Sequence, residues 1–171
     1  AENLKFLETF IKPSKDSADY SDLLSNYGMM YGMQSKYDTS IQYYQRAILI
    51  NEKNDNTVSL ASNYSNIAIG FQQLANFPQA LFYQQKSLKL AEDNNDETTQ
   101  AYTLVNMGIT YTLMRDSSRS EQAYRTSILL AERHHLRHVY LTAILNLSTL
   151  QQHTKQWKAC SFARKSMRRI P

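Results

Sequence analysis

Apolar residues recur at intervals of three and four along this chain, in stretches separated by short polar breaks. In the first stretch Leu24, Tyr27 and Tyr31 fall on one helical face, and a second stretch begins at Tyr37 after a polar break at residues 34–36. This spacing is typical of amphipathic helices, whereas half-buried strands alternate apolar and polar residues. The chain has only four Gly and three Pro, which argues against a loop-rich or β-rich fold. The pattern therefore predicts an all-α protein.

The helical stretches repeat every 40 residues, and the copies align without insertion or deletion. One column of the repeat holds small residues, which are Gly28, Ala68, Gly108 and Ser148. A second small column consists of Ser40, Ala80, Ser120 and Cys160, and a mostly aromatic one of Tyr37, Phe77, Ser117 and Trp157. Small residues at fixed points let two helices pack closely. Each copy thus predicts a pair of helices, and stacking of the pairs creates the core.

The polar break inside each copy sets the expected helix positions. We expect first helices near residues 21–35, 61–75, 101–115 and 141–154. Second helices are expected near 37–53, 77–93, 117–134 and 156–169. Residues 3–12 have the register of a second helix, so a short helix is expected there, packed on the first repeat. The column that starts with Gly28 and ends with Ser148 should be buried where the two helices of each pair cross.

These columns resemble the tetratricopeptide repeat family, whose signature alternates small and large residues at the same offsets. The signature stands here as Leu24–Gly28–Tyr31–Ser40–Tyr44–Ala47, Tyr64–Ala68–Phe71–Ala80–Ser87 and Leu104–Gly108–Tyr111–Ser120–Tyr124–Ser127. The resemblance covers about 150 of the 171 residues. It implies an all-α, right-handed superhelical solenoid of four helix-turn-helix repeats plus an N-terminal half-repeat helix. Residues 1–171 then form a single domain, with a capping part at 1–20 and repeats at 21–60, 61–100, 101–140 and 141–171.

Two features depart from the usual family pattern. The unit is longer than the family's usual length of about 34 residues, and the proline that usually closes the second helix is absent. Glu52, Glu92 and Glu132 occupy that region, so the second helix should run longer. Such longer units with an asparagine on the first helix are similar to those of kinesin light chains, Pins-type polarity adaptors and bacterial quorum-sensing peptide receptors. We expect a segment of a larger protein, or an array capped by a half-repeat and a basic helix.

An asparagine stands at the same place in all four copies, at positions 26, 66, 106 and 146. Asparagine is a poor residue for a helix interior, because its amide competes for backbone hydrogen bonds. Twelve asparagines occur in the whole chain, so a column filled in four copies of four is improbable by chance. Retention of one side chain against its propensity indicates a repeated role.

The family resemblance implies that the first helices line a concave groove that binds a peptide. Carried over to this sequence, the expected peptide-binding residues are Asn26, Asn66, Asn106, Asn146, Met29, Met33, Ile69, Gln73, Tyr102, Ile109, Leu113, Thr149 and His153. Among the groove-facing positions only Asp22 carries a firm charge. Co-chaperone members of the family clamp a C-terminal carboxylate with Lys and Arg, and this chain lacks that set. An acidic C-terminal tail is therefore not the expected ligand.

The asparagine amide offers both a hydrogen-bond donor and an acceptor. One side chain can therefore pair with the N–H and C=O groups of an extended ligand without reading the ligand's side chains. Packed helices lie ~8–10 Å apart and an extended chain rises ~3.3 Å per residue, so one asparagine should meet roughly every third ligand residue. The alternative is that these amides bond to neighbouring helices within the stack.

The charges of the chain are unevenly distributed. Through Leu113 there are eight basic and twelve acidic residues, whereas from Met114 onward there are eleven basic and three acidic ones. Such asymmetry fits an acidic partner, nucleic acid or an anionic membrane surface. The favoured interpretation is a solvated outer face together with a junction with a following domain, and we do not expect nucleic acid as the main partner.

The remaining candidate sites give no chemistry. His134, His135 and His138 cluster at the join of two copies. His134 and His138 could share a helical face, but no third ligand stands at a recognisable metal-binding spacing from them. Cys160 is the single cysteine, and its column predicts a buried structural thiol. No nucleophile–base pair or phosphate loop is recognisable, so neither an enzyme nor a cofactor is expected.

No apolar run is long enough to insert into a membrane. We expect a cytoplasmic protein, or a periplasmic sensor if the segment belongs to a membrane-anchored protein.

The sequence therefore predicts a peptide- or protein-binding module, the sensor or docking domain of a larger regulatory or signalling protein. Two alternatives come from other classes. One is a structural module that self-associates or couples to an adjoining output domain, and the other is recognition of an acidic partner or nucleic acid by the basic C-terminal end.

Overall fold

The computed structural model describes residues 18–167, and of residue 154 and residues 156–167 it describes the backbone alone. Within this part the chain forms seven helices and no strand, so the predicted all-α fold is confirmed. The helices are α2 (Ala18–Met33), α3 (Tyr37–Lys53), α4 (Thr57–Gln73), α5 (Phe77–Asp93), α6 (Glu97–Leu113), α7 (Ser117–Arg133) and α8 (Arg137–Met167). The helix expected at residues 3–12 lies outside the described residues.

Six turns separate the helices, and each contains one residue in the left-handed region of φ. These residues are Ser35, Asp55, Ala75, Asn95, Arg115 and His135, with φ between 50° and 62°. They are spaced every 20 residues, and α3 to α7 are each 17 residues long, so the repeat is built from helices of equal length joined by equivalent turns. The same backbone bonds close each turn: the N–H of Asn76, for example, donates to the C=O of Phe71 at 2.8 Å. A left-handed residue with this bond is a common helix C-terminus.

In the first three repeats the second helices begin and end close to the predicted positions, but the first helices do not. α4 begins at Thr57 and α6 at Glu97, four residues before the predicted starts. The side chains of Asn56 and Asp96 accept hydrogen bonds from the N–H groups of Ser59 and Thr99. These caps satisfy free N–H groups of the first turn, so each helix starts where its cap stands.

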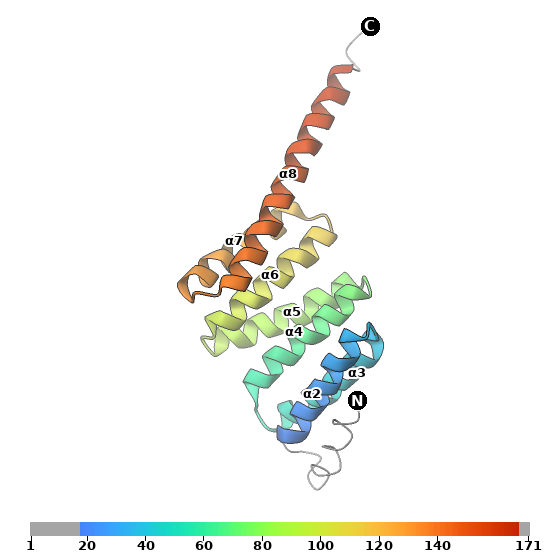
Figure 1. The fold of residues 1–171 in the computed structure, drawn as a ribbon, viewed down its shortest axis with the longest axis vertical. Coiled ribbons are helices and arrows are strands. Elements are labelled where there is room, and N and C mark those ends of the chain that lie inside the picture. The colour runs from blue at the N-terminus through green and yellow to red at the C-terminus, as the bar shows by residue number, and fades with distance from the viewer. Residues whose placement is uncertain (1–17, 168–171) are drawn as a thin grey trace.

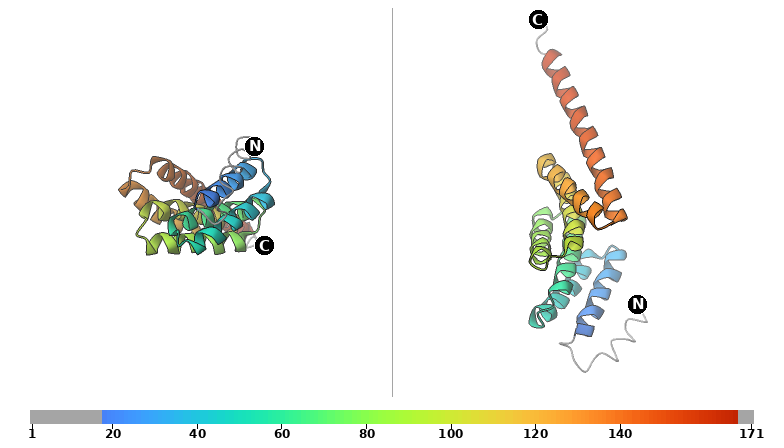
Figure 2. Two further views of the ribbon diagram at one scale, coloured as in Figure 1. Left: turned by 90° about the horizontal axis from the view of Figure 1, so that it is seen from below. Right: turned by 90° about the vertical axis from the view of Figure 1, so that its left-hand side faces the viewer.

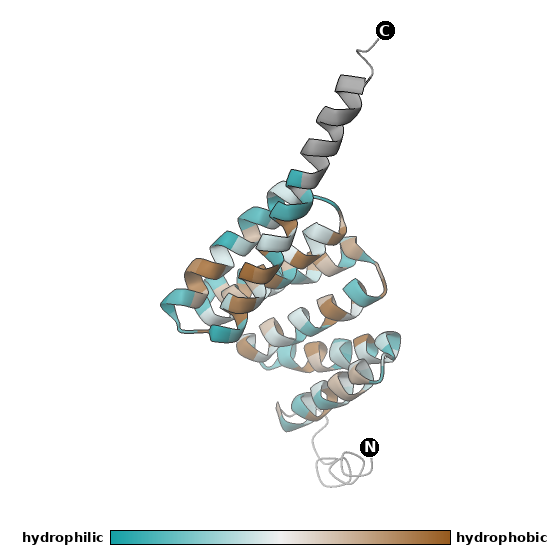
Figure 3. Cartoon of the chain, turned by 45° about the horizontal axis from the view of Figure 1, so that its top comes forward, coloured by the Kyte–Doolittle hydropathy of each residue, from teal (hydrophilic) through white to brown (hydrophobic). Residues whose placement is uncertain are grey.

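Consecutive helices are antiparallel and stack into an elongated array, from α2 at one end to α8 at the other (Figure 1). The first helices of neighbouring repeats touch one another, because α4 contacts both α2 and α6, and α6 contacts α8. Among the described helices no second helix makes such a contact with the second helix of the next repeat. The first helices therefore form the inner, more closely spaced layer of a curved stack. Figure 3 shows that apolar and polar residues are mixed along its helices.

The small-residue column is buried in the first three repeats, as predicted. A Cβ atom at Gly108 would lie 2.5 Å from the Tyr124 ring, and one at Gly28 would lie 2.9 Å from the Tyr44 ring. In the second repeat Ala68 is fully buried, and Gln84 replaces the tyrosine of the facing column. The larger residue on one helix is thus matched by a smaller one opposite.

Serine hydroxyls tie the two helices of a repeat together. Ser87 and Ser127 each donate to a backbone C=O, those of Ala61 and Ala101, at 2.8 Å. In another column Ser120 donates to the C=O of Gly108 at 2.9 Å. Because these hydroxyls are buried, their bonds remove the cost of burying an unpaired polar group.

The fourth repeat differs from the prediction. A single helix, α8, runs from Arg137 to Met167, where a pair at 141–154 and 156–169 was expected. The second half of α8 extends away from the stack beyond α7 (Figures 1 and 2). Ser148 is consequently exposed, so its predicted burial is wrong. Gln156 stands at the position of the caps Asn76 and Asp116 and is not a favoured N-cap residue, so this segment lacks the cap that starts α5 and α7. The side chain of Cys160 lies outside the described residues.

Candidate functional site

The asparagine column lies on the first helices α2, α4, α6 and α8. Asn26 is exposed, and Asn66, Asn106 and Asn146 are partly buried, so none is sealed between helices. The side chains of the first three make no hydrogen bond within the described residues. Asn146 Nδ2 donates to the C=O of Thr142 in its own helix at 2.9 Å. The amides at 26, 66 and 106 are thus available to a ligand.

Two members of the column share one hollow. Asn66 on α4 and Asn106 on α6 line a depression of about 330 Å³ between these helices. The other lining residues are Ser62, Ser65, Ile69, Thr99 and Tyr102. Four predicted site residues, Asn66, Asn106, Ile69 and Tyr102, are therefore brought together on the inner layer of the stack.

Hydroxyl groups fix the floor of this hollow. Ser65 Oγ lies 2.8 Å from Ser87 Oγ on α5 and 3.4 Å from Thr103 Oγ1 on α6. A similar bond joins the preceding first helices, where Ser25 Oγ donates to Asn63 Oδ1 at 2.9 Å. Ser65 is thus committed to neighbouring helices, and it holds α4 against α6 while Asn66 beside it remains free.

Apolar side chains surround the amides on the same layer. Met29, Met33 and Leu113 are at least half exposed, at 55%, 82% and 50%. Tyr102 at 45% and Ile69 at 38% are also exposed beside the hollow. The first helices thus expose both apolar side chains and unpaired amides.

Several predicted residues do not line the hollow. Ile109 is partly buried and packs against the core cluster of Val105 and Tyr124, so it contributes mainly to the core. Gln73, Thr149 and His153 are exposed on α4 and α8 and are not among the residues that line the hollow. Asn26, Met29, Met33, Leu113 and Asn146 also belong to the first helices but lie outside this hollow.

Thr99 lines the hollow but was missed from the sequence, because α6 was expected to start at residue 101. Its N–H donates to Asp96 Oδ1 at 3.0 Å. Burial works against ionisation of Asp96, but hydrogen bonds from Thr99 and Thr98 and the nearby His134 lower its pKa below the usual range. The Asp96–Glu97 pair ahead of an apolar run is a recognisable start signal that would have placed Thr99 on the helix.

Ion pairs stabilise the edge of this region. Glu97 accepts from Arg133 Nη1 at 2.8 Å and lies 2.6 Å from His134 Nε2. These two partners lower the pKa of the Glu97 carboxyl. The pair joins the start of α6 to the end of α7. The three histidines 134, 135 and 138 are exposed at the turn and the start of α8, as predicted for a solvated junction.

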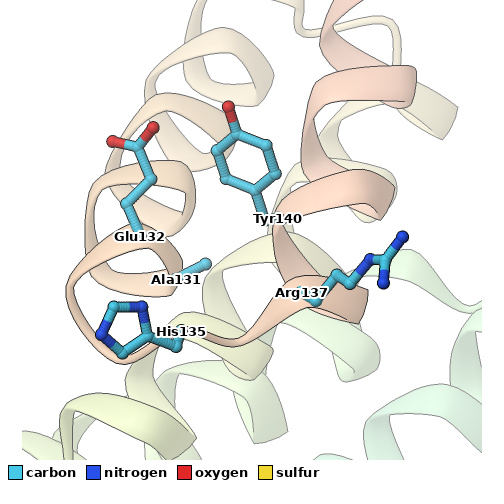
Figure 4. Close-up of a pocket in the computed structure, with 5 residues that line it drawn as sticks. All are labelled: Ala131, Glu132, His135, Arg137 and Tyr140. Carbon is cyan, nitrogen blue, oxygen red and sulfur yellow. The ribbon is translucent and has the colours of Figure 1, made fainter.

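Two further hollows lie away from the asparagines. One is formed by α3, α4 and α5 around Glu52, Tyr64 and Lys86. The other, of about 510 Å³, lies between the end of α7 and the start of α8. In Figure 4 its walls are Glu132 and Tyr140, with His135 in the turn between them. Neither places a column of like side chains on one face. Among the described helices none is long and apolar enough to span a membrane.

Comparisons with known proteins agree with this fold. The family model for the tetratricopeptide repeat matches residues 19–93, and no curated protein matches the chain. The chain is similar to the structure of BtubC (BKLC) from P. vanneervenii, with 19% identity, 99% of this chain and 72% of that chain covered, and a TM-score of 0.76. It is also similar to aspartyl phosphate phosphatase F from Bacillus subtilis, with 19% identity, 96% and 43% coverage and a TM-score of 0.82. The corresponding values for the apo form of RapI are 16%, 93%, 58% and 0.82.

The chain spans about half the length of the latter two proteins. Identities this low show a shared fold and do not by themselves transfer an activity. The family model covers the first two repeats, and the 40-residue register continues through α6 and α7 without a break. Residues 19–93 therefore match the tetratricopeptide repeat model, and the helices that follow continue the same fold.

Proposed function

We propose that this chain binds a peptide segment in extended conformation along its first-helix layer, as the sensor or docking part of a larger regulatory protein. The observation that carries the proposal is the hollow shared by Asn66 and Asn106. Neither side-chain amide has a hydrogen-bond partner within the described part of the chain, and each can donate to and accept from a ligand backbone. Ile69 and Tyr102 supply apolar surface at the same place.

The ligand chemistry follows from the lining. The residues that form the hollow are uncharged, and all seven are polar, aromatic or aliphatic. An isolated charge on the ligand would gain no partner there, whereas backbone amides and apolar side chains would. The ligand is therefore an uncharged or apolar stretch of extended chain, read mainly through its backbone.

A displayed library of random peptides of about ten residues, the length that four asparagines would span, provides the probe. Peptides enriched on the wild-type chain are measured by fluorescence anisotropy against Asn66→Ala and Asn106→Ala. Each change should weaken binding by roughly 1–3 kcal/mol, because it leaves a ligand donor and acceptor unpaired in a partly dry groove. Helix content should not fall, since Ala is the better helix former.

Gln42→Ala is the matched control, because it removes an exposed amide from α3, in the outer layer. It should leave affinity unchanged. Peptides methylated at single backbone nitrogens should lose affinity at about every third position. Equal binding by wild type and both asparagine variants would refute the groove as the site.

The basic C-terminal end is the less favoured site. Arg119, Arg125 and Arg133 pair with Asp116, Glu121 and Glu97, which leaves less unpaired charge than the sequence suggests. Phosphate binding releases counterions, so nucleic-acid affinity would fall steeply with added salt. Salt-independent binding of the selected peptides, unaffected by Arg168→Ala, would favour the groove.

A further inference from the structure

The first half of α8 lacks the second helix that covers its counterparts. Ser21, Ala61, Ala101 and Leu141 occupy equivalent positions near the start of the four first helices. The first three side chains are at most 4% exposed, whereas Leu141 is 47% exposed. Ser148 is likewise exposed, although Gly28, Ala68 and Gly108 are buried. α8 therefore presents an open face where every earlier first helix has a partner.

The hollow of Figure 4 lies beside this open face, next to Tyr140. The residue equivalent to Tyr140 in the second repeat is Leu60, which is buried in a cluster against which Leu90 of α5 packs. The space that a second helix would occupy is thus open along α8, both at Tyr140 and at Leu141 and Ser148.

The chain itself carries a sequence that matches this space. Residues 156–167 continue the 40-residue register of α3, α5 and α7, with Trp157 in the aromatic column and Cys160 in the small column. In the structure these residues form the second half of α8 and point away from the stack (Figures 1 and 2). A straight helix cannot fold back onto its own first half.

We propose that two copies of this chain exchange these segments, so that the second half of α8 from each copy covers the first half of α8 in the other. The two helices of a repeat are antiparallel, and two α8 helices related by a two-fold axis near residue 156 are antiparallel as well. Each copy then gains the missing second helix of its fourth repeat. Exchange of an identical element is a low-cost route to a symmetric dimer.

Residues 155–156 lie where the fourth repeat would need a turn, and their identities favour a continuous α8. In the second and third repeats the turn between the two helices pairs a left-handed residue with an N-cap side chain, Ala75–Asn76 and Arg115–Asp116, whereas Ser35–Lys36 of the first repeat has no side-chain cap. Lys155 and Gln156 occupy these positions, and both favour a helix interior over a cap or a left-handed turn. Conversion of a hinge into continuous helix is what the exchange requires.

A disulfide placed by the repeat register tests the exchange. A Cβ at Gly32 would lie 4.0 Å from Ser40 Cβ, and Thr112 Oγ1 lies 2.6 Å from Ser120 Oγ. The equivalent pair in the fourth repeat is 152 and 160, and a Cβ separation near 4 Å suits a disulfide. Gln152→Cys is therefore introduced beside the natural Cys160, the single cysteine of the chain. Within one straight helix these two positions are about 12 Å apart, too far to bond.

The 171-residue chain carrying Gln152→Cys is oxidised at low concentration and run on a non-reducing gel. The exchange predicts a covalent dimer, twice the 19.8 kDa of one chain. A compact disulfide-bonded monomer would show that the segment folds back within one copy, and no disulfide at all would show that something else covers the face; either result overturns the proposal. Wild type and Thr149→Cys, which places the thiol at another exposed position of α8, should remain uncrosslinked.

A hinge variant tests the same exchange without oxidation. Lys155→Gly combined with Gln156→Asp restores a left-handed residue and a cap, and it should convert the dimer to a monomer in sedimentation velocity. Lys155→Ala with Gln156→Ala keeps the helix favourable and should stay dimeric. A wild-type chain that sediments as a monomer, or a hinge variant that stays dimeric, would contradict the exchange.

Discussion

At the scale of single residues, the fold depends on size matching across each helix pair. Ala68 is fully buried in the column that faces Tyr44 in the first repeat and Tyr124 in the third. Ala68→Leu should therefore overpack this crossing and lower the free energy of unfolding by about 1–3 kcal/mol. Thermal unfolding followed by circular dichroism measures the change. Ile69→Leu, at the exposed neighbouring position, is the control, and an unchanged melting midpoint for Ala68→Leu would mean that the column is misplaced.

Single residues also show how much of the candidate site could be predicted from the sequence. The asparagine column was visible because an unfavourable helix residue recurred at a fixed period, and the structure leaves its amides at least partly exposed. Ile109 is partly buried against the core cluster, because the same helical face carries both groove and core positions and only packing separates them. The contribution of the asparagines to ligand binding stays a prediction.

At the scale of elements, the turns of the repeat are the parts under local strain. Ala75 adopts φ 57°, a left-handed conformation in which its Cβ approaches the following carbonyl. Ala75→Gly should raise the free energy of unfolding by about 0.5–1 kcal/mol, because glycine relieves this contact although it also loosens the unfolded chain. Chemical denaturation measures the gain.

Asn95 occupies the equivalent turn after α5, and asparagine tolerates this conformation better than alanine does. Asn95→Gly should accordingly give a smaller gain. A larger gain at Asn95 than at Ala75 would contradict the argument from backbone strain.

Helix ends show which local signals the sequence analysis used and which it overlooked. Second helices were placed well because apolar periodicity and the polar break agree at Tyr37 and Phe77. First helices were placed late because their first turns are polar, and only the caps Asn56 and Asp96 reveal the start. The fourth repeat shows the opposite case: the periodicity predicts two helices, but residues 155–156 lack the side-chain cap that Asn76 and Asp116 provide in the second and third repeats.

At the scale of the whole molecule, each described repeat contacts only its neighbours. A perturbation of buried residues in several repeats at once should therefore unfold the whole array. Buried tyrosines offer such a perturbation by pH. Burial raises the pKa of Tyr44 to about 12, and burial together with a hydrogen bond to Glu52 raises that of Tyr64 to about 12. Burial also raises the pKa of Tyr124, although hydrogen bonds with Thr112 and Ser120 oppose this effect. These residues belong to three successive repeats.

The sign of the pH dependence follows from these shifts. The unfolded chain ionises its tyrosines near pH 10, whereas the folded chain keeps Tyr44 and Tyr64 neutral to about pH 12. Their contribution to stability is therefore fully present below pH 10 and is lost as the pH rises from 10 toward 12. Helical circular dichroism and phenolate absorbance should change together in this window, as one transition. Tyr44→Phe, which cannot ionise, should shift the midpoint to higher pH, while a phenolate signal that rises fully before any helix is lost would show that these rings are not buried as the structure places them.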